Sequence, residues 1–140
     1  MVKPCYNHTI TLWGGKTMSV ARGFLRLAKK YERRMKYCHD YMVNNRDAHI
    51  TQLREAIGCA KQFLDISYEE LENWSDSIQA VYEVDEFDNI FQRVELVFLK
   101  KYVNWMYSRT LKEIYIVEEA KKRLKNILNK LEVLNAFRRI

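Results

Sequence analysis

Proline and glycine are scarce in this chain of 140 residues. It contains one proline, Pro4, and four glycines, and neither residue occurs after Gly58. Because proline and glycine are the residues that most often end helices, nothing beyond residue 58 requires a turn. With 48% hydrophobic and 13% aromatic residues, the chain is also too apolar to be disordered. The composition predicts an all-α protein of one domain with a buried core.

Long hydrophobic runs are missing as well. No run approaches the roughly 18 apolar residues of a membrane-spanning helix, and residues 1–5 lack the apolar segment of a signal peptide. We therefore expect an intracellular protein without a membrane span. The three cysteines Cys5, Cys38 and Cys59 are an odd number, so an internal disulfide framework is not expected. All three are expected to be reduced, although one could pair between subunits.

Motifs for catalysis or metal binding are absent too. The candidate zinc ligands do not have the spacing of a zinc site: they are Cys5, His8, Cys38 and His39. No nucleophile motif and no glycine-rich phosphate loop is present. We expect no catalytic residue, no metal site and no cofactor.

One enzymatic alternative stays open. Arg34 and His39 are separated by four residues and match the Arg-x4-His signature of HEPN-type ribonucleases, which are helical bundles. In that family the pair meets across a dimer to cleave RNA, with the histidine in acid/base catalysis. The pattern lies in the middle of the first predicted helix, earlier than such motifs usually fall.

Basic and acidic residues separate along the chain. Residues 65–95 carry ten Asp and Glu against one Arg, whereas residues 1–64 carry twelve basic against four acidic residues. Residues 96–140 are basic again, with eleven against four. This pattern indicates an acidic tip on a basic body, or contacts between unlike surfaces. A set of solvated faces is the alternative interpretation.

Capping residues and hydrophobic spacing divide the chain into four segments. Residues 1–18 are expected to form an extended arm, and Ser19 is expected to cap a first long helix over residues 19–43. Asp47 is a candidate cap for the next helix, and capping boxes begin at Ser67 and Thr110. We therefore expect a new or redirected helix at Ser67, another helix from about residue 85, and a bend before a C-terminal helix over residues 110–138.

The first long helix has two faces. At 100° per residue, an apolar stripe from Val20 to Met42 is predicted to pack inward. A basic row lies roughly opposite and could follow the phosphates of a nucleic acid, unless it is merely solvated. Its members are Arg22, Arg26, Lys29, Arg33 and Lys36.

Three further apolar seams follow. The second helix has a seam of Ile50, Leu53, Ile57, Ala60 and Leu64, and Gly58 within it indicates close helix packing. The next helix has an apolar side of Phe87, Ile90, Phe91, Val94, Phe98 and Trp105. The C-terminal helix has heptad spacing from Val117 to Leu134 and requires a partner helix.

Two short segments resemble hepadnavirus-type core proteins. The segment from Leu53 to Cys59 resembles the start of that family's spike helix, where Leu-Arg-x-Ala-Ile-x-Cys recurs at this spacing. Ser108-Arg109 followed by Tyr115-Ile116-Val117 is similar to the helix after the spike, which opens with Gly-Arg and carries Tyr-Leu-Val. The family's proline-rich segment and arginine-rich tail have no counterpart here.

The resemblance implies a long helical hairpin over residues 47–107 that pairs with its copy into a four-helix bundle. The acidic block would then contain the exposed tip, and Cys59 would face its copy across the dimer. The helix after Arg109 would make contacts between dimers. The dimer interface implied in this way comprises Leu53, Ile57, Cys59, Ala60 and Leu64.

Three functions follow as ranked hypotheses. The first is a non-enzymatic capsid protein that dimerises, assembles into a shell and encloses RNA or DNA, located in the virion and the host cytoplasm. The second is a helical accessory protein that binds nucleic acid directly through the basic row. The third is a HEPN-like ribonuclease.

Overall fold

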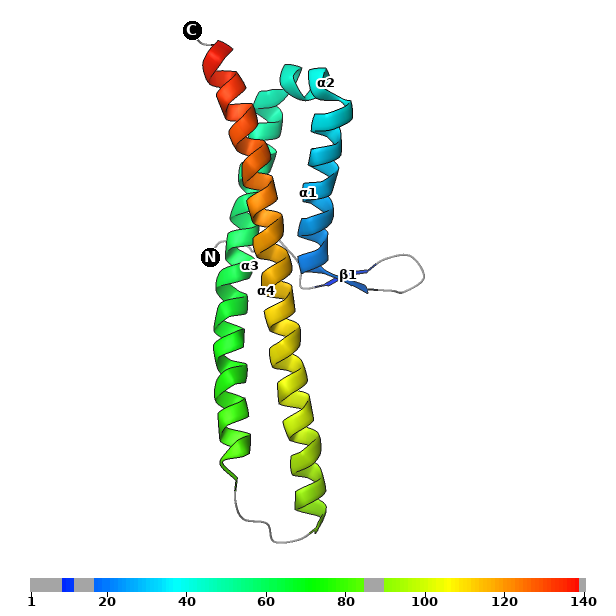
Figure 1. The fold of residues 1–140 in the computed structure, drawn as a ribbon, viewed down its shortest axis with the longest axis vertical. Helices are drawn as coiled ribbons and strands as arrows, with labels where there is room; N and C mark the ends of the chain where they lie inside the picture. Colours follow the sequence, from blue (N-terminus) through cyan, green and yellow to red (C-terminus); the bar gives the residue numbers. More distant parts are fainter. Residues whose placement is uncertain (1–8, 12–16, 85–89, 139–140) are drawn as a thin grey trace. The chain divides into compact units, whose positions relative to one another are not determined.

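The computed structural model describes residues 9–11, 17–84 and 90–138, and these residues confirm the all-α class (Figure 1). Four helices follow a small two-stranded sheet within this part of the chain. In order, the elements are β1 (Thr9–Thr11), β2 (Thr17–Ser19), α1 (Val20–Tyr37), α2 (His39–Asn44), α3 (Arg46–Tyr82) and α4 (Ile90–Arg138).

The predicted extended arm contains the sheet. β1 pairs with β2 in antiparallel register, with Thr9 opposite Ser19 and Thr11 opposite Thr17. Ser19 then caps α1 as predicted, because its side chain accepts a hydrogen bond from the backbone N–H of Arg22. The sheet and the cap together fix the point at which α1 begins.

The first long helix is interrupted at Cys38, where one continuous helix was predicted. Cys38 has a non-helical backbone with φ −127° and ψ 40°, and it separates α1 from the short helix α2. The break allows the chain to turn before α3, and Met42 of α2 is fully buried against the core. Arg46 supports the turn, since its Nη1 donates a 2.7 Å hydrogen bond to the carbonyl of Val43.

Both internal capping boxes were wrong as helix starts. Ser67 and Thr110 lie inside α3 and α4, which run without a break for 37 and 49 residues. A serine or threonine is tolerated there when its hydroxyl bonds to the carbonyl one turn earlier. Ser77 does so in α3, with its hydroxyl donating to the carbonyl of Asn73 at 2.9 Å.

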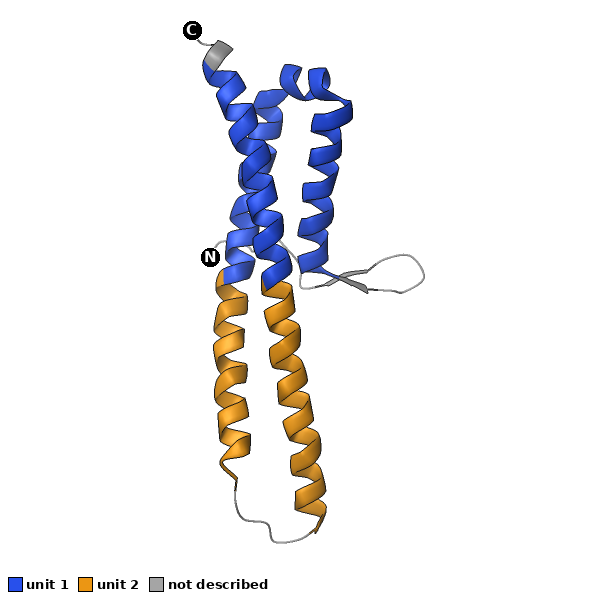
Figure 2. Ribbon diagram, in the orientation of Figure 1, with its two compact units in different colours: residues 1–64, 115–140 blue, residues 65–114 orange. Residues whose placement is uncertain are grey.

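The chain forms two compact units (Figure 2). Unit 1 consists of residues 1–64 and 115–140, and unit 2 of residues 65–114. Residues of both α3 and α4 belong to each unit. Unit 1 therefore combines α1 and α2 with the first part of α3 and the last part of α4.

Unit 1 contains the main hydrophobic core. Three helices contribute most of it, because α1 supplies Ala28 and Tyr31, α3 supplies Leu53, and α4 supplies Leu124 and Leu131. Leu53, Leu124 and Leu131 are fully buried. The apolar heptad positions of the C-terminal segment thus pack against other helices of the same chain.

Unit 2 is a pair of helical segments with little buried apolar surface. The rings of Trp74 on α3 and Tyr102 on α4 meet edge to face, with 5.8 Å between their centroids. Asn104 of α4 donates a 3.1 Å hydrogen bond to the hydroxyl of Tyr82 on α3. These contacts bring the two segments side by side, as the predicted helical hairpin requires.

Candidate functional site: a basic row and an exposed apolar hairpin

The structure places the whole basic row of α1 on the surface. Its five residues are exposed: Arg22, Arg26, Lys29, Arg33 and Lys36. Within the described residues none of the five side chains forms an ion pair with an acidic residue. The one acid on α1, Glu32, is engaged elsewhere, because its Oε1 lies 2.6 Å from Nη2 of Arg123 on α4. The positive charge of the row is thus available to an external anion.

Aromatic side chains stand at the C-terminal end of this row. Tyr37, the last residue of α1, is 73% exposed, and Tyr41 of α2 is 57% exposed. The Nζ of Lys36 lies 5.2 Å from the centroid of the Tyr37 ring, within the range of a cation–π contact. The free thiol of Cys38 is exposed between them. These tyrosines were not among the predicted site residues, although their proximity to the basic row is visible in the sequence.

A buried polar cluster packs against Tyr41, on α2. His49 of α3 is buried between two tyrosine rings, with its centroid 6.0 Å from that of Tyr31 and 5.7 Å from that of Tyr41. The hydroxyl of Tyr31 donates a 2.7 Å hydrogen bond to Oε1 of Gln52. Arg34 lies over the Tyr31 ring at 5.8 Å. Tyr41 is therefore fixed on one side although its other side faces solvent.

The cluster changes the proton affinity of two of its members. Burial lowers the pKa of His49 below its ordinary 6.5, and the positive charge of Arg34 lowers it further, while Gln52 opposes both effects. Neither ring nitrogen of His49 has a hydrogen bond of good geometry within the described residues. Burial also raises the pKa of Tyr31 above 10.0, against the lowering effect of Arg34. His49 is thus held as a neutral imidazole at pH 7.

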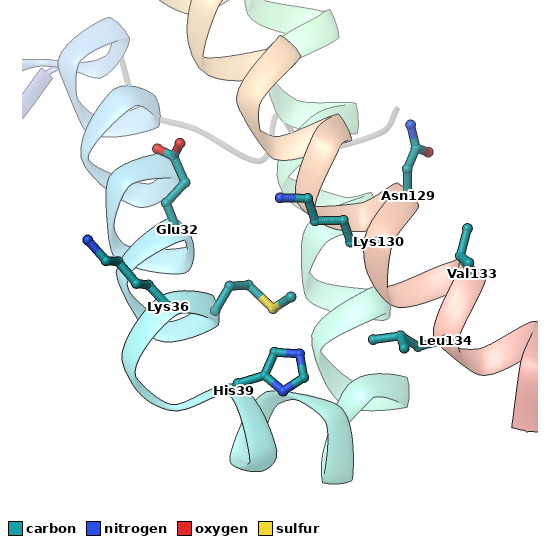
Figure 3. A pocket seen from close by; sticks show the side chains of 8 residues that line it. Glu32, Lys36, His39, Asn129, Lys130, Val133 and Leu134 are labelled. Carbon is teal, nitrogen blue, oxygen red and sulfur yellow. The ribbon is translucent and has the colours of Figure 1, made fainter.

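A hollow of about 630 Å³ lies between α1, α2 and α4 in unit 1 (Figure 3). Met35, Val133 and Leu134 give it an apolar lining, and Lys36 and Lys130 are its cations. His39 stands at its edge, where Nδ1 lies 3.8 Å from Oδ1 of Asp40. The hollow is wide open, and the carboxylate of Glu32, which also lines it, is already paired with Arg123.

The Arg34 and His39 pair is not brought to one site by this arrangement. Arg34 packs against the ring of Tyr31, whereas His39 lines the hollow and is exposed. Because the helix is interrupted at Cys38, Arg34 lies on α1 and His39 lies on α2. No group of three or more potential metal ligands is formed by the residues that the structure describes. Cys5 and His8, considered as zinc ligands, lie outside those residues.

Most members of the predicted dimer interface on α3 lie in the core of unit 1. Leu53 and Ala60 are fully buried and Leu64 is 6% exposed, all within unit 1, and Ile57 packs against the same core. A side chain that is already covered by its own chain has no surface left to bury against a copy. Gly58 also differs from expectation, because a Cβ added there would meet no atom within 4 Å.

Cys59 is not a free thiol either. It is half-buried and forms a disulfide bond. The expectation of three reduced cysteines is therefore wrong for Cys59, and its sulfur is not available for the cross-link between subunits that the resemblance implied.

The apolar surface missing from the α3 seam is present on unit 2 instead. Several large apolar side chains of this part of α4 are exposed, and five of them recur at helical spacing: Phe91, Val94, Phe98, Tyr102 and Trp105. We call these five residues the apolar stripe. Phe91 is 76% exposed and Phe98 67%. At 100° per residue, Phe91, Val94, Phe98 and Trp105 lie on the side away from Val103 and Ile114, the buried apolar residues of this segment. Tyr102 lies at the edge of the stripe, where its ring also contacts Trp74 of α3.

The spacing in the sequence predicted an apolar side that contains Phe91, Val94, Phe98 and Trp105, but it did not indicate Tyr102 or what covers this side. Among the described helices, none has a stretch long and apolar enough to cross a bilayer. No protein-family model, curated protein or solved structure matches the chain.

Proposed function

We propose that this protein is the subunit of a self-assembling, capsid-type core. Two copies associate through unit 2, dimers assemble further through α4, and the shell encloses nucleic acid bound by the basic row. The observation that carries this proposal is the exposure of the apolar stripe on unit 2. The resemblance of two segments to hepadnavirus-type core proteins supports the same conclusion.

The apolar stripe is too large to be left in water by an isolated subunit. Burying a phenylalanine side chain is worth about 1.5–3 kcal/mol, so the exposure of Phe91 and Phe98 alone forgoes several kcal/mol. Tyr82 and Ile90 add further exposed apolar surface near the end of each segment. A contiguous patch of this kind marks an interaction surface.

A second copy is the partner that fits. Two helices cannot enclose a core, whereas two hairpins together make a four-helix bundle. The stripe repeats at spacings of three and four residues, so it can meet itself across a two-fold axis, where each patch contacts its own copy. Dimerisation would bury the stripes of both subunits at once.

Charge in unit 2 favours the same pairing. The α3 segment, residues 65–82, contains five acidic residues and no Lys or Arg, whereas the α4 segment, residues 90–114, contains five basic and two acidic residues. In a four-helix bundle of two hairpins, α3 of one copy can lie beside α4 of the other. Unlike charges then face each other along the bundle.

Further assembly is assigned to α4 beyond Arg109. Tyr115, in this part of the helix, is 71% exposed and Val133 is exposed as well. Large apolar side chains on the surface of unit 1 provide contacts that do not compete with those of unit 2. The division matches a capsid subunit, which needs one interface for the dimer and another between dimers.

A single substitution in the stripe tests the dimer. Phe98→Glu places a charge in the proposed interface and is expected to give a monomer in sedimentation velocity at a concentration where the wild-type protein is at least a dimer. Ala48→Glu is the control, because it introduces the same charge at an exposed position of α3 in unit 1 that belongs to neither proposed interface. A Phe98→Glu protein that sediments like the wild type would contradict the hairpin dimer.

A second candidate is an accessory protein that binds nucleic acid without forming a shell. The exposed and unpaired basic row favours it, because phosphate binding requires cations that are not already neutralised. Both candidates share this surface, and they differ in assembly. Electron microscopy of the purified protein separates them, since only a capsid-type subunit forms closed shells.

A further inference from the structure

We propose that the junction of α1 and α2 is a base-stacking site, and that the nucleic acid bound along the basic row is single-stranded. This inference rests on the proposed function, namely the binding of nucleic acid by the basic row. It adds an uncharged binding site next to the basic row, and it predicts that a single strand is bound in preference to a duplex.

Tyr37 continues the basic row. It follows Arg33 by four residues, so the two side chains lie on the same face of α1, one turn apart. Its ring is 73% exposed, and the Lys36 ammonium group lies 5.2 Å from the ring centroid. A phosphate bound by Lys36 would therefore have its neighbouring base within reach of the Tyr37 ring.

Tyr41 provides a second ring on the adjacent helix. Its edge-to-face contact with the buried His49, at 5.7 Å, restricts one side of the ring, while more than half of the residue stays exposed. A ring that is already fixed loses little conformational entropy when a base stacks on it. Exposed side chains occupy every position from Lys36 to Tyr41, so nothing within α1 and α2 covers this junction.

Stacking on exposed rings selects for unpaired bases. In a duplex each base is already stacked between its neighbours and presents only its edges in the grooves. In a single strand the faces of the bases are accessible, and stacking on an aromatic side chain is worth about 1–3 kcal/mol per base. A basic row that ends in exposed tyrosines therefore recognises a single strand better than a duplex.

The test uses the full chain and two RNA probes: an unstructured single strand of mixed sequence, and the duplex of that sequence. Binding is followed by fluorescence anisotropy over a range of salt concentrations. The variants are Tyr37→Leu, which removes the ring, and Tyr37→Phe, which keeps it. Tyr68→Leu is the control, because Tyr68 is an exposed tyrosine on α3 that belongs to none of the proposed binding surfaces.

Tyr37→Leu is expected to weaken binding of the single strand by about 5- to 100-fold. The dependence of affinity on salt should keep its slope, because no phosphate contact is lost. Tyr37→Phe and Tyr68→Leu should bind like the wild type, and duplex affinity should be unchanged in all three variants.

Several results would overturn the inference. These are no loss with Tyr37→Leu, an equal loss with Tyr37→Phe, an equal loss for the duplex, or a reduced salt slope that indicates an effect through Lys36. Wild-type protein that binds neither RNA overturns both the stacking site and the nucleic-acid role of the row. The dimer of unit 2 is tested separately and is unaffected by that outcome.

Discussion

His49 and Tyr41 form an edge-to-face pair with 5.7 Å between their ring centroids, and this pair connects a buried imidazole to an exposed ring. Both nitrogens of His49 lack a hydrogen bond of good geometry among the described residues. Two guanidinium groups lie near the imidazole in the chain: Arg34 lowers the pKa of His49, and Arg46 is buried one turn earlier on α3. A proton added to His49 would create a third positive charge in this region.

Acid is therefore expected to destabilise the protein through His49. The folded-state pKa is lowered, so the unfolded chain binds more protons below pH 6.5. The contribution of His49 to stability is fully present above pH 6.5 and is lost as the pH falls from there to the lowered pKa. Over that interval the loss is at most about 1.4 kcal/mol per pH unit.

The check is urea denaturation of wild-type and His49→Phe proteins at pH 7.5 and pH 5. Phenylalanine keeps an aromatic ring beside Tyr31 and Tyr41 but cannot be protonated, so the wild type should lose more stability between the two pH values than the variant does. His39→Gln is the control, since His39 is exposed, and it should retain the wild-type difference. Equal pH dependence in wild-type and His49→Phe proteins would contradict this role of His49.

Gly58 offers a simple gain in stability. A Cβ at this position meets nothing within 4 Å, and glycine in a helix interior costs about 0.5–1 kcal/mol relative to alanine. Gly58→Ala is thus expected to raise the free energy of unfolding by about that amount, measured by urea denaturation. A lower stability of Gly58→Ala would instead support the close helix packing that the sequence indicated.

The secondary structure was largely predictable because local signals agreed with it. Ser19 caps α1, the second strongly periodic segment is α3, and scarcity of glycine and proline predicted the helical class correctly. Breaks were predicted less well. Ser67 and Thr110 are buried inside long helices, so the spacing of a capping box alone could not indicate a helix start.

The surfaces were harder to predict than the helices, because spacing shows that a face is apolar but not what covers it. Leu53 and Phe98 are both on apolar seams in the sequence, yet Leu53 is fully buried and Phe98 is 67% exposed. The difference arises because α1 covers α3 in unit 1, and the described part of unit 2 contains no third helix. The exposure of the charged face was easier to predict, since all five members of the basic row are exposed as their spacing predicted.

Charge reversal in the basic row should weaken binding of nucleic acid. Arg26→Glu combined with Arg33→Glu removes two candidate phosphate contacts and is expected to lower the salt slope of binding by about one unit per contact. Lys122→Glu with Lys125→Glu serves as the control, because it reverses two exposed charges on α4. Filter binding at several salt concentrations measures both the affinity and its salt slope. If the basic row is only solvated, the double variant will leave both unchanged.

Ribonuclease activity dependent on His39 is not expected. Arg34 packs on Tyr31, and His39 is exposed with only Asp40 within 4 Å as an ionic partner, so neither is oriented for acid/base catalysis in the subunit. Incubation of labelled RNA with wild-type and His39→Ala proteins should give the same absence of cleavage. Cleavage that disappears in His39→Ala would favour the HEPN-like alternative, in which a second copy completes the site.

The mass of the wild-type protein in solution tests the central claim most directly. Sedimentation equilibrium at roughly micromolar concentration should give at least twice the 16.9 kDa of one chain, because association through unit 2 buries the apolar stripe of each subunit. Raising the concentration should shift the protein to larger assemblies. A species that stays at 16.9 kDa across this range would contradict a self-assembling subunit.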